Sequence, residues 1–440
     1  MKTIVILVDN KRRDLPGAAL IAHQLKKVGV RCELEPLGAW RSVLWAHKPD
    51  MIIFNHLNAA HLESYSQELH RRGVLTAVLP NEGIFYDEVD MEFNAAKFHN
   101  NGHIDYFFCW NHVHANAVKR TRKKTDAESH VIGIPRFDFY FPPLAKTFPE
   151  ATRKKVLICT NFIFAKFNDL PSSVGERFFG RWSDAVPAYK NWRTFVAMDH
   201  EARLQFFDFL NAAVRQTDHE IILRPHPNGN PAPFDAWYKS LSSNTKERVR
   251  YDREGNIADL ILECDLEVAR DTCTTTMEAW IAGKPTLDIH LTDHPVFHQD
   301  FTEKLTPVCD QPEHFPRMID DLLKNGEPER FNEPRKEHLQ KWCNTPDGRV
   351  CERFAALLKG IVEAQPAPDF SHISFSDVRR GARLKALKAI GLPCTYKPFL
   401  SLKYLFNPRK GFGKKKAYEK TIKPSDVKQW MAKFEHPEAS

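Results

Sequence analysis

Hydrophobic residues in the first 135 positions gather into short runs that alternate with longer stretches of helical periodicity. Short apolar runs are typical of buried strands, whereas apolar residues three and four positions apart are typical of helices. The runs occupy residues 3–8, 31–37, 51–55, 74–79, 104–109 and 130–134, and helical stretches such as 18–28, 59–72 and 113–120 lie between them. This alternation predicts βαβ units and a parallel sheet.

A second alternation of the same kind begins at residue 155. Strands are predicted at 155–160, 220–223, 249–251 and 285–289, helices at 200–216, 233–242, 275–282, 313–325 and 349–364, and a further apolar stretch covers 257–269. Prolines and aromatic residues break the pattern at 136–153, which predicts a linker. The aromatic, irregular stretch 161–199 predicts a long surface loop rather than core.

These patterns predict an α/β protein with two Rossmann-like domains that face a cleft, followed by a basic C-terminal helical extension. The length of 440 residues is too great for one ordinary domain and agrees with this division. We place the first domain at 1–140, the second at 141–365 and the extension at 366–440, after the segment Gln365-Pro366-Ala367-Pro368.

Composition excludes several classes of protein. The chain is 42% hydrophobic and 27% charged, which is ordinary for a globular enzyme and excludes a disordered chain. No stretch reaches the roughly 18 apolar residues of a spanning helix, and the run at 3–8 is too short for a secretory signal. Nine cysteines without a C-x-x-C pair argue against a disulfide framework and a zinc ribbon, so we expect a cytoplasmic location.

Basic residues concentrate in the last seventy positions. Residues 371–440 hold 16 Lys and Arg against 5 Asp and Glu, whereas the rest of the chain holds 47 against 51. Aromatic residues such as Phe399, Tyr404 and Phe406 lie among these lysines and arginines. A mildly acidic body with a basic, partly aromatic tail indicates a reversible anchor on an anionic inner-membrane surface rather than a nucleic-acid-binding core. The alternative is a helical extension that packs on the body.

The second domain contains two polar motifs that each follow an apolar run. Arg224-Pro225-His226-Pro227 follows the strand at 220–223, and its prolines hold the His226 backbone extended. Because open α/β sheets bind ligands at the carboxyl ends of their strands, His226 and the Arg224 fork are candidates for binding a phosphate or carboxylate. The alternative is a local turn in which the imidazole bonds to nearby backbone.

The second motif is the run from Asp271 to Pro285, whose hydroxyl residues Thr274, Thr275 and Thr276 precede a short helical stretch. Such a cluster predicts a helix N-terminus, where free N–H groups and the helix dipole favour anions. Glu278, in the first turns, is a candidate for binding a ribose or sugar hydroxyl. Simple capping by threonine is the alternative reading.

Taken together, these motifs resemble those of GT-B glycosyltransferases that build bacterial surface carbohydrates, including capsule-type Kdo transferases. The resemblance extends to the CDP-glycerol glycerophosphotransferases, whose pattern contains Gly-x-Pro-Arg-x-Asp, Arg-x-His-Pro and a Ser/Thr cluster. Here these read Gly133-Ile134-Pro135-Arg136-Phe137-Asp138, Arg224-Pro225-His226-Pro227 and Thr274-Thr275-Thr276. The three motifs occur in the family's order, and the resemblance covers roughly residues 1–360.

The resemblance implies that His226 and the threonines hold nucleotide phosphates and that Glu278 reaches the ribose or the donor sugar. The CDP-glycerol enzymes usually carry an acidic-Tyr-Ser-Ser run where this chain has Asp271-Thr272-Cys273-Thr274, which favours a CMP-activated sugar such as Kdo. No D-x-D triplet occurs, so we expect a metal-independent enzyme with no cofactor beyond its nucleotide-sugar substrate. A polyol-phosphate transferase and an isomerase of the sugar-nucleotide 2-epimerase type remain as alternatives.

The first domain is expected to face a glycan or glycolipid acceptor and to supply the catalytic carboxylate. Glu82 follows a predicted strand beside Gly83, a glycine that permits an unusual turn, and Asp9 and Asp14 flank the basic residues after the first strand. Arg12 and Arg13, together with Arg136, are candidates for binding the acceptor or an anion. His56 is a lesser candidate.

A metal reading of the 288–298 segment is weak, because Asp288, His290, Asp293, His294 and His298 match no strong metal-binding spacing. We therefore predict no metal site. Because the basic residues are concentrated in the tail, we also predict no nucleic-acid partner.

Overall fold

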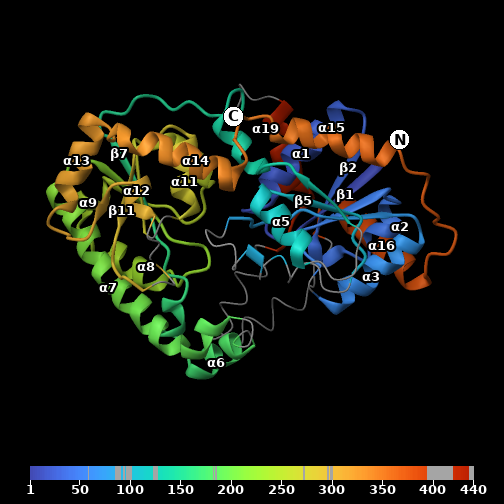
Figure 1. Cartoon of the computed structure of the whole chain (residues 1–440), viewed down its shortest axis with the longest axis horizontal. Coiled ribbons are helices and arrows are strands. Elements are labelled where there is room, and N and C mark those ends of the chain that lie inside the picture. The colour runs from blue at the N-terminus through green and yellow to red at the C-terminus, as the bar shows by residue number, and fades with distance from the viewer. Residues whose placement is uncertain are drawn as a thin grey trace. The chain divides into compact units, whose positions relative to one another are not determined.

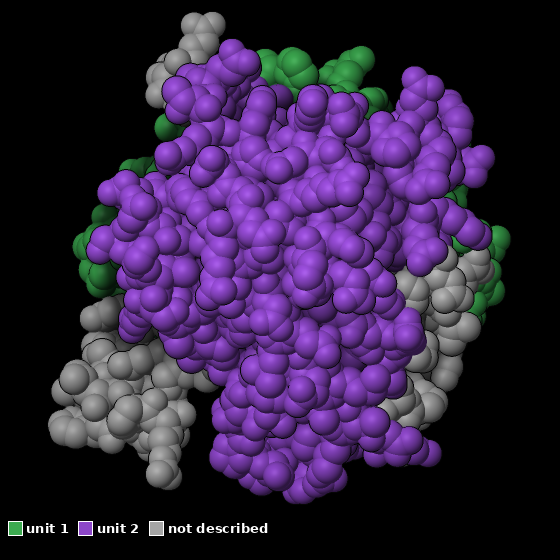
Figure 2. Space-filling view, turned by 90° about the vertical axis from the view of Figure 1, so that its left-hand side faces the viewer, with its two compact units in different colours: residues 1–144, 339–440 green, residues 145–338 purple. Residues whose placement is uncertain are grey.

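The computed structural model describes the chain except residues 58, 85–90, 93–94, 96–101, 122–126, 182, 184–185, 271–272, 295–296, 298–300, 394–419 and 436–440. The described residues form two compact units, 1–144 with 339–440 and 145–338, which Figure 2 shows in different colours. Among the described helices, none combines the length and the apolar character that crossing a bilayer requires.

Unit 1 is built on a six-stranded, all-parallel sheet in the order β2-β1-β3-β4-β5-β6. Its strands are β1 (Thr3–Val8), β2 (Arg31–Pro36), β3 (Met51–Phe54), β4 (Leu75–Val78), β5 (Tyr106–Cys109) and β6 (Glu128–Val131). All six residues of β1 are buried, which is the pattern of a central parallel strand covered on both faces.

Helices cover both faces of this sheet. They are α1 (Leu15–Lys27), α2 (Val43–His47), α3 (Ala60–Arg71), α5 (His112–Thr121), α15 (Val350–Glu363), α16 (Phe375–Ala389) and α19 (Pro424–Glu435), with 3₁₀ turns η1 (Leu37–Ala39) and η2 (Pro135–Tyr140). The connection from β1 to β2 runs in the opposite sense to the later ones, so α1 lies on one face and α2, α3 and α5 on the other. α15 and α19 pack against α1, and α16 packs against α2 (Figure 1).

Unit 2 has its own six-stranded parallel sheet, in the order β12-β11-β10-β7-β8-β9. The strands are β7 (Lys155–Cys159), β8 (Glu220–Arg224), β9 (Val249–Tyr251), β10 (Leu266–Arg270), β11 (Thr286–Ile289) and β12 (Val308–Cys309). The helices are α6 (Ser172–Gly180), α7 (Trp192–Gln216), α8 (Ala232–Ser240), α9 (Ser243–Lys246), α10 (Ile257–Glu263), α11 (Thr274–Ile281), α12 (Thr302–Leu305) and α13 (Phe315–Asn325), with 3₁₀ turns η3 (Ala165–Phe167), η4 (Pro187–Asn191) and η5 (Glu329–Phe331). The helix α14 (Asn332–Cys343) begins in unit 2, and its residues from 339 onward group with unit 1. The main core joins β7, β8 and β10 to α7, α8 and α13 through residues such as Ile158, Phe206, Phe234 and Phe315.

The prediction of a surface loop at 161–199 is wrong. This segment contains α6, two 3₁₀ turns and the start of α7, and it builds a second, aromatic core. That core consists of Phe167, Phe179, Trp192, Phe195, Val196 and Phe297. A side chain at Gly175 would place its Cβ 2.4 Å from the Trp192 ring, so α6 approaches the indole through a glycine. Aromatic residues without clear periodicity here form a buried cluster rather than a loop.

The prediction of a linker at 136–153 is also wrong in its first part, because η2 is buried. The Asp138 carboxylate accepts hydrogen bonds from the Val350 and Cys351 N–H groups at 3.0 and 2.7 Å. It therefore satisfies the free donors at the start of α15 and ties this helix to unit 1.

The compact units differ from the predicted domains at the C-terminal side. Residues 339–365, assigned from sequence to the second domain, group with unit 1, and so do the described parts of 366–440. α16 is attached by Arg41 to Asp377, at 3.1 Å, and by Lys388 to Glu33 and Glu35, at 3.0 and 2.7 Å. α19 places the Phe434 ring against His23 and Phe139. The tail residues Phe399, Tyr404 and Phe406 lie outside the described residues.

Candidate functional site

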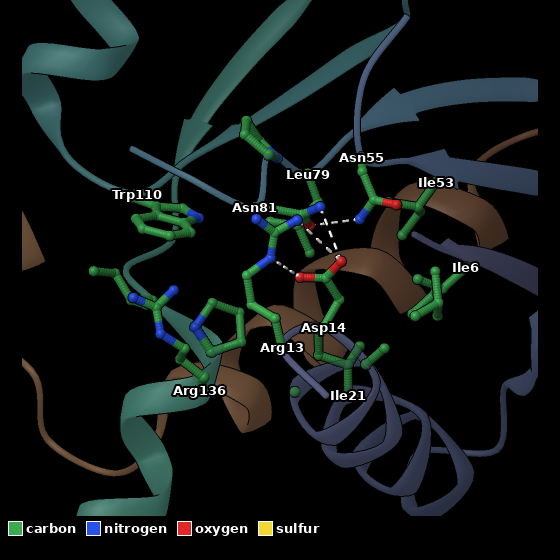
Figure 3. A pocket seen from close by; sticks show the side chains of 16 residues that line it. Ile6, Arg13, Asp14, Ile21, Ile53, Asn55, Leu79, Asn81, Trp110 and Arg136 are labelled. Atoms are coloured by element: carbon green, nitrogen blue, oxygen red, sulfur yellow. Dashed lines mark hydrogen bonds and ion pairs between the residues drawn. The ribbon is translucent and has the colours of Figure 1, made fainter. Parts of the chain in front are cut away.

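A pocket in unit 1 lies at the carboxyl ends of the strands, next to the neighbouring strands β1 and β3. At this point the strand order changes direction, because β2 lies on one side of β1 and β3 to β6 lie on the other. Ligands of open α/β sheets bind at such a switch point. Side chains from five strand ends and from α1 line the pocket (Figure 3): Ile6, Val8, Arg13, Asp14, Gly17, Ala18, Ile21, Ile53, Asn55, Leu79, Pro80, Asn81, Trp110, Ile134, Pro135 and Arg136. Three of the predicted residues, Arg13, Asp14 and Arg136, therefore share one pocket.

Asp14 is the centre of a hydrogen-bonded chain on one side of this pocket. Its carboxylate accepts from Arg13 Nε at 2.7 Å, from the Asn10 N–H at 3.0 Å and from Asn81 Nδ2 at 3.0 Å. Asn55 Nδ2 in turn donates to Asn81 Oδ1 at 2.6 Å (Figure 3). Burial raises the pKa of Asp14, and the adjacent Arg13 guanidinium acts in the opposite direction. With three donors already bound, Asp14 is well placed to orient Arg13 and the two amides.

Glu82 is joined to this network through Arg13, whose Nη1 donates to Glu82 Oε1 at 2.9 Å. The Glu82 side chain is 63% exposed, whereas that of Asp14 is 7% exposed. Of the predicted carboxylates, Glu82 thus combines access to solvent with contact to the pocket's arginine. Asp9 is bound elsewhere, because its Oδ1 lies 2.6 Å from Lys420 Nζ.

Two other sequence candidates lie beside the pocket rather than in its wall. The Arg12 N–H donates to Asn10 Oδ1 at 2.8 Å, within the turn that leads from β1 into α1. Neither Arg12 nor His56 is among the lining residues. Burial lowers the pKa of His56, so its imidazole favours the neutral form.

Trp110 and Arg136 form the wall opposite Asp14. The Arg136 guanidinium lies 4.9 Å from the centre of the Trp110 ring, within the range of a cation–π interaction. A Cβ at position 83 would lie 2.9 Å from this ring, so Gly83 allows the backbone to pass close to the indole. The φ angle of Gly83 is not positive, which corrects the prediction of an unusual turn there. Sequence analysis missed Trp110, Asn55 and Asn81, although Asn55 ends a predicted strand and the other two lie just after predicted strands.

The corresponding edge of unit 2 brings together the two motifs predicted to bind the donor. β7 lies between β8 and β10, so the segments after these strands flank its end. Thr160 Oγ1, just after β7, accepts the His226 N–H at 3.1 Å. The neighbouring Cys159 thiol hydrogen-bonds with the side chain of Thr275 in the first turn of α11. Cys159, the last residue of β7, and the adjacent Thr160 therefore contact one motif each.

The His226 ring has a defined tautomer. Its Nδ1 accepts the Asn228 N–H at 3.1 Å, so in the neutral ring the proton is on Nε2. The local turn named as the alternative is thus present in the structure, and in this tautomer Nε2–H is the donor of the ring. Arg224 is engaged on the β9 side, where it donates to the Gly255 carbonyl at 2.8 Å and to Asp252. These contacts hold the 252–255 turn.

The predicted helix after the threonine cluster is confirmed as α11, and Gly283 has the positive φ of 68° expected just beyond the helix end. Thr276 and Glu278 are buried, and Thr275 Oγ1 lies 2.8 Å from Glu267 Oε1 of β10. Glu267 is fully buried, and burial raises its pKa to about 8. A neutral carboxyl therefore lies beneath the first turn of α11. Asp271 is outside the described residues.

A buried ion pair that sequence analysis missed shapes the same edge of unit 2. Arg270, the last residue of β10, is 2.5 Å from Asp199 Oδ1 of α7, and both side chains are fully buried. Asp199 Oδ2 also accepts the N–H groups of Phe164 and Ala165, at 3.0 and 2.7 Å. The pair thereby holds the segment after β7 in place. In the 288–298 segment, His290 pairs with Asp293 at 2.9 Å, and His298 lies outside the described residues.

Comparison of sequences gives no match to a family model and none to a curated protein. Comparison of structures gives matches along most of the chain. A putative UDP-N-acetylglucosamine 2-epimerase from Listeria monocytogenes superimposes with a TM-score of 0.52 at 14% identity, covering 85% of this chain and all of the other. The wall teichoic acid polymerase TagF, soaked with CDPG, gives a TM-score of 0.50 at 11% identity over 82% of this chain and 88% of its own.

At these identities the likeness concerns the fold. This chain has two doubly wound, all-parallel six-stranded sheets, each with its switch point between inner strands, and its two-domain fold matches that of these structures. The protein therefore has the two-domain GT-B fold that the sequence predicts.

Proposed function

We propose that this protein is a metal-independent transferase that moves a sugar from a nucleotide-activated donor to a glycan or glycolipid acceptor. Unit 2 binds the donor, and unit 1 binds the acceptor that reacts with it. The departure from the CDP-glycerol motif favours a CMP-activated acid sugar such as Kdo, and a surface polysaccharide or glycolipid is the acceptor class that the resemblance implies. GT-B-fold proteins that act on nucleotide sugars support the broader assignment.

The observation that carries this proposal is that His226 and the first turn of α11 both contact the end of β7, through Thr160 and Cys159. The His226 Nε2–H and the N–H groups of α11 are donors suited to a diphosphate or monophosphate. The proton on Glu267 removes a negative charge that would otherwise lie beneath this anion site. Glu278 is placed for a ribose or sugar hydroxyl, whereas Arg224 acts indirectly by fixing the neighbouring turn.

Two alternative functions use the same donor site. A polyol-phosphate transferase shares the motifs of the CDP-glycerol family, and TagF supports it by fold. A sugar-nucleotide 2-epimerase is supported in the same way by the Listeria protein. Dependence on an acceptor separates them: an epimerase consumes its nucleotide sugar alone, whereas both transferases require an acceptor.

The donor assignment is tested by titrating the full chain with CMP, CDP, UMP and UDP in a calorimeter. We expect a cytidine nucleotide to bind most tightly and His226→Ala to weaken it about 10- to 100-fold, the range for a hydrogen bond to a charged group. His219→Ala is the matched control, because His219 precedes the same strand at its opposite end and pairs with Asp320. Equal affinity of H226A and the wild type would remove His226 from the site.

We also propose that the outer face of α16 contacts anionic lipid. Phe375 and Ile390, at its two ends, are 82% and 70% exposed, and the exposed Arg379, Arg380 and Arg383 lie between them. Apolar residues flanking a basic stretch suit a helix that lies on a membrane surface. This reading keeps the predicted membrane contact but assigns it to a helix that is docked on unit 1.

A further inference from the structure

The hydrogen-bonded chain at the unit 1 pocket has a fixed polarity. The Asp14 carboxylate can only accept, so Asn81 must present its Nδ2 to it, as observed at 3.0 Å. Asn81 Oδ1 then faces Asn55 and accepts from its Nδ2 at 2.6 Å. The charge of Asp14 thereby sets both amides, and Asn55 must direct its carbonyl oxygen away from Asn81.

Asn55 Oδ1 is consequently an acceptor at the end of the chain. Asn55 is 7% exposed, and this oxygen is buried with no hydrogen-bond partner among the residues that the structure describes. Rotating the amide would not resolve this, because it would bring two oxygens together at Asn81. The oxygen belongs to a residue that lines the pocket (Figure 3).

A second buried polar atom of opposite character belongs to the same pocket. Trp110 is 4% exposed, and its Nε1–H has no acceptor in the described part of the chain. The ring cannot turn away, since Gly83 packs against it and Arg136 covers its face. Buried polar groups are usually paired, and an unpaired donor and an unpaired acceptor in one pocket indicate a ligand that carries both functions.

Charge narrows the ligand class further. Arg13 is balanced by Asp14 and Glu82, at 2.7 and 2.9 Å. Arg136 lies across the pocket, stacked on Trp110, and its fork suits a carboxylate or a phosphate. An indole N–H, an amide oxygen and an arginine in one pocket suit a hydroxylated ring that bears one anionic group.

We propose that this pocket binds an anionic sugar, a sugar acid or a sugar phosphate, with Asn55 and Trp110 as specificity-determining residues. Asn55 Oδ1 accepts from a ring hydroxyl, Trp110 Nε1–H donates to a ring or substituent oxygen, and Arg136 faces the anionic group. The proposal deepens the transferase assignment and rests on it for the identification of the ligand as a sugar. The positions of the unpaired donor and acceptor do not depend on that assignment, because they follow from the hydrogen bonds within the pocket.

The test is calorimetric titration of the full chain with sodium glucuronate, glucose 6-phosphate, glucose and inorganic phosphate. We expect at least one anionic sugar to bind ten or more times more tightly than glucose and than inorganic phosphate. The comparison of glucuronate with glucose 6-phosphate identifies the anion. Binding of neither anionic sugar above the level of glucose would overturn the proposal, and equal binding of inorganic phosphate would reduce the site to one for simple anions.

Variants assign the contacts. Trp110→Phe keeps the ring and removes the N–H, so it should weaken the anionic sugar and glucose about 5- to 10-fold alike. Arg136→Met should abolish the preference for the anionic sugar over glucose, whereas Arg120→Met, which removes an exposed arginine paired with Glu92, should not. If W110F fails to fold by circular dichroism, Asn55→Ala tests the acceptor instead and should weaken the same ligands. Wild-type affinity in W110F and N55A would contradict the assignment.

Nucleotide titrations of the same samples separate this inference from the function on which it rests. If CMP binds and no sugar binds, the pocket assignment alone fails. Binding of the anionic sugar without any nucleotide would keep the pocket and contradict the transferase. CMP affinity should be unchanged in W110F and R136M, because both residues belong to unit 1 and the nucleotide site is built from unit 2.

Discussion

Glu82 and Asp14 both contact Arg13, but their surroundings suit different tasks. Asp14 is buried and accepts three hydrogen bonds, whereas Glu82 is exposed and holds Arg13 through Oε1. A general base must exchange its proton with a reacting hydroxyl, which favours the accessible carboxylate. Asp14 is then a positioning residue for Arg13, Asn81 and, through it, Asn55.

Glu82→Gln keeps the hydrogen bond to Arg13 and removes the proton-accepting charge. Turnover with the donor that the nucleotide panel identifies should fall about 100-fold or more, while CMP affinity stays unchanged. Glu128→Gln is the matched control, because Glu128 is equally exposed at 63% and lies on β6 of the same unit. Turnover of E82Q close to that of E128Q would transfer the role to Asp14, Asp9 or His56.

Glu267 gives a prediction about pH and stability. Its folded-state pKa of about 8 lies above the ordinary value of 4.5, because burial disfavours the charged carboxylate and Glu278 adds a like charge nearby. The folded chain therefore keeps a proton that the unfolded chain releases. The stability linked to this proton is fully present below pH 4.5 and is lost as the pH rises toward 8.

Glu267→Gln imitates the neutral carboxyl and removes this dependence. Relative to wild type, E267Q should become progressively more stable from about pH 5 to pH 8, by roughly a few kcal/mol at the upper end. Urea unfolding of both proteins across this pH range measures the difference. A constant difference between the two proteins would mean that Glu267 is ionised in the folded chain.

Residue types and strand ends were enough to predict part of each site. His226, Arg13 and Arg136 follow strands whose ends could be read from the sequence, and in the structure each lies just beyond the end of its strand. Thr275 was instead found from the hydroxyl cluster that predicted a helix N-terminus, and it lies in the first turn of α11. The hydrogen-bond partners of the site residues could not be predicted from the sequence. The strand pattern does not show side-chain directions, and these decide that Arg224 donates to Gly255 and Asn55 to Asn81.

At the scale of elements, α16 shows how a basic segment can be docked and still present a basic face. Its inner side buries Asp377, Gly381 and Leu384 against unit 1, and Lys388 reaches Glu33 and Glu35. The charge count of the tail alone predicted an anchor, because it did not distinguish paired from exposed basic residues. In the structure, α16 is packed on the rest of unit 1 by its inner side and exposes basic residues on its outer side.

The exposed face of α16 predicts salt-dependent attachment to lipid. Arg379→Glu with Arg380→Glu should largely abolish co-sedimentation with vesicles containing phosphatidylserine, since each basic residue near the surface contributes about 1 kcal/mol. Arg317→Glu with Lys336→Glu is the control, with the same change of charge at exposed positions of unit 2. Wild-type attachment should weaken as salt rises, because screening shortens the reach of the charges. Equal loss in both double variants would indicate an effect of net charge alone.

For the whole molecule, the alternation of strands and helices predicted both sheets and most element boundaries to within a few residues. The prediction failed where long-range contacts decide. The aromatic segment before α7 becomes core only because Phe179, Trp192 and Phe195 meet, and α15 joins unit 1 because Asp138 caps it across more than two hundred positions. Neither contact has a local periodicity that a sequence pattern can reveal.

Removal of the tail is the test of how unit 1 is completed. A chain that ends at Pro368 lacks α16 and α19, and therefore exposes the surfaces that Leu384, Ile422 and Phe434 cover in the full protein. The deletion also removes Lys388, the ion-pair partner of the buried Glu35, and Glu435, the ion-pair partner of Lys26. A reversible membrane anchor, which the charge of the tail indicates, could be removed without unfolding the chain, whereas the alternative of an extension packed on the body could not.

The structure predicts a different result. Each large apolar side chain contributes roughly 1.5–3 kcal/mol when buried, so unit 1 should lose several kcal/mol and melt on the order of 10 °C lower. Unit 2 contains none of the deleted residues and has its own core, so its melting and its affinity for CMP should be retained at temperatures below the unit 1 transition. Differential scanning calorimetry with and without CMP distinguishes the two transitions, because CMP raises the melting temperature only of the unit that binds it. A shortened chain with unchanged melting would show that α16 and α19 rest on unit 1 without stabilising it.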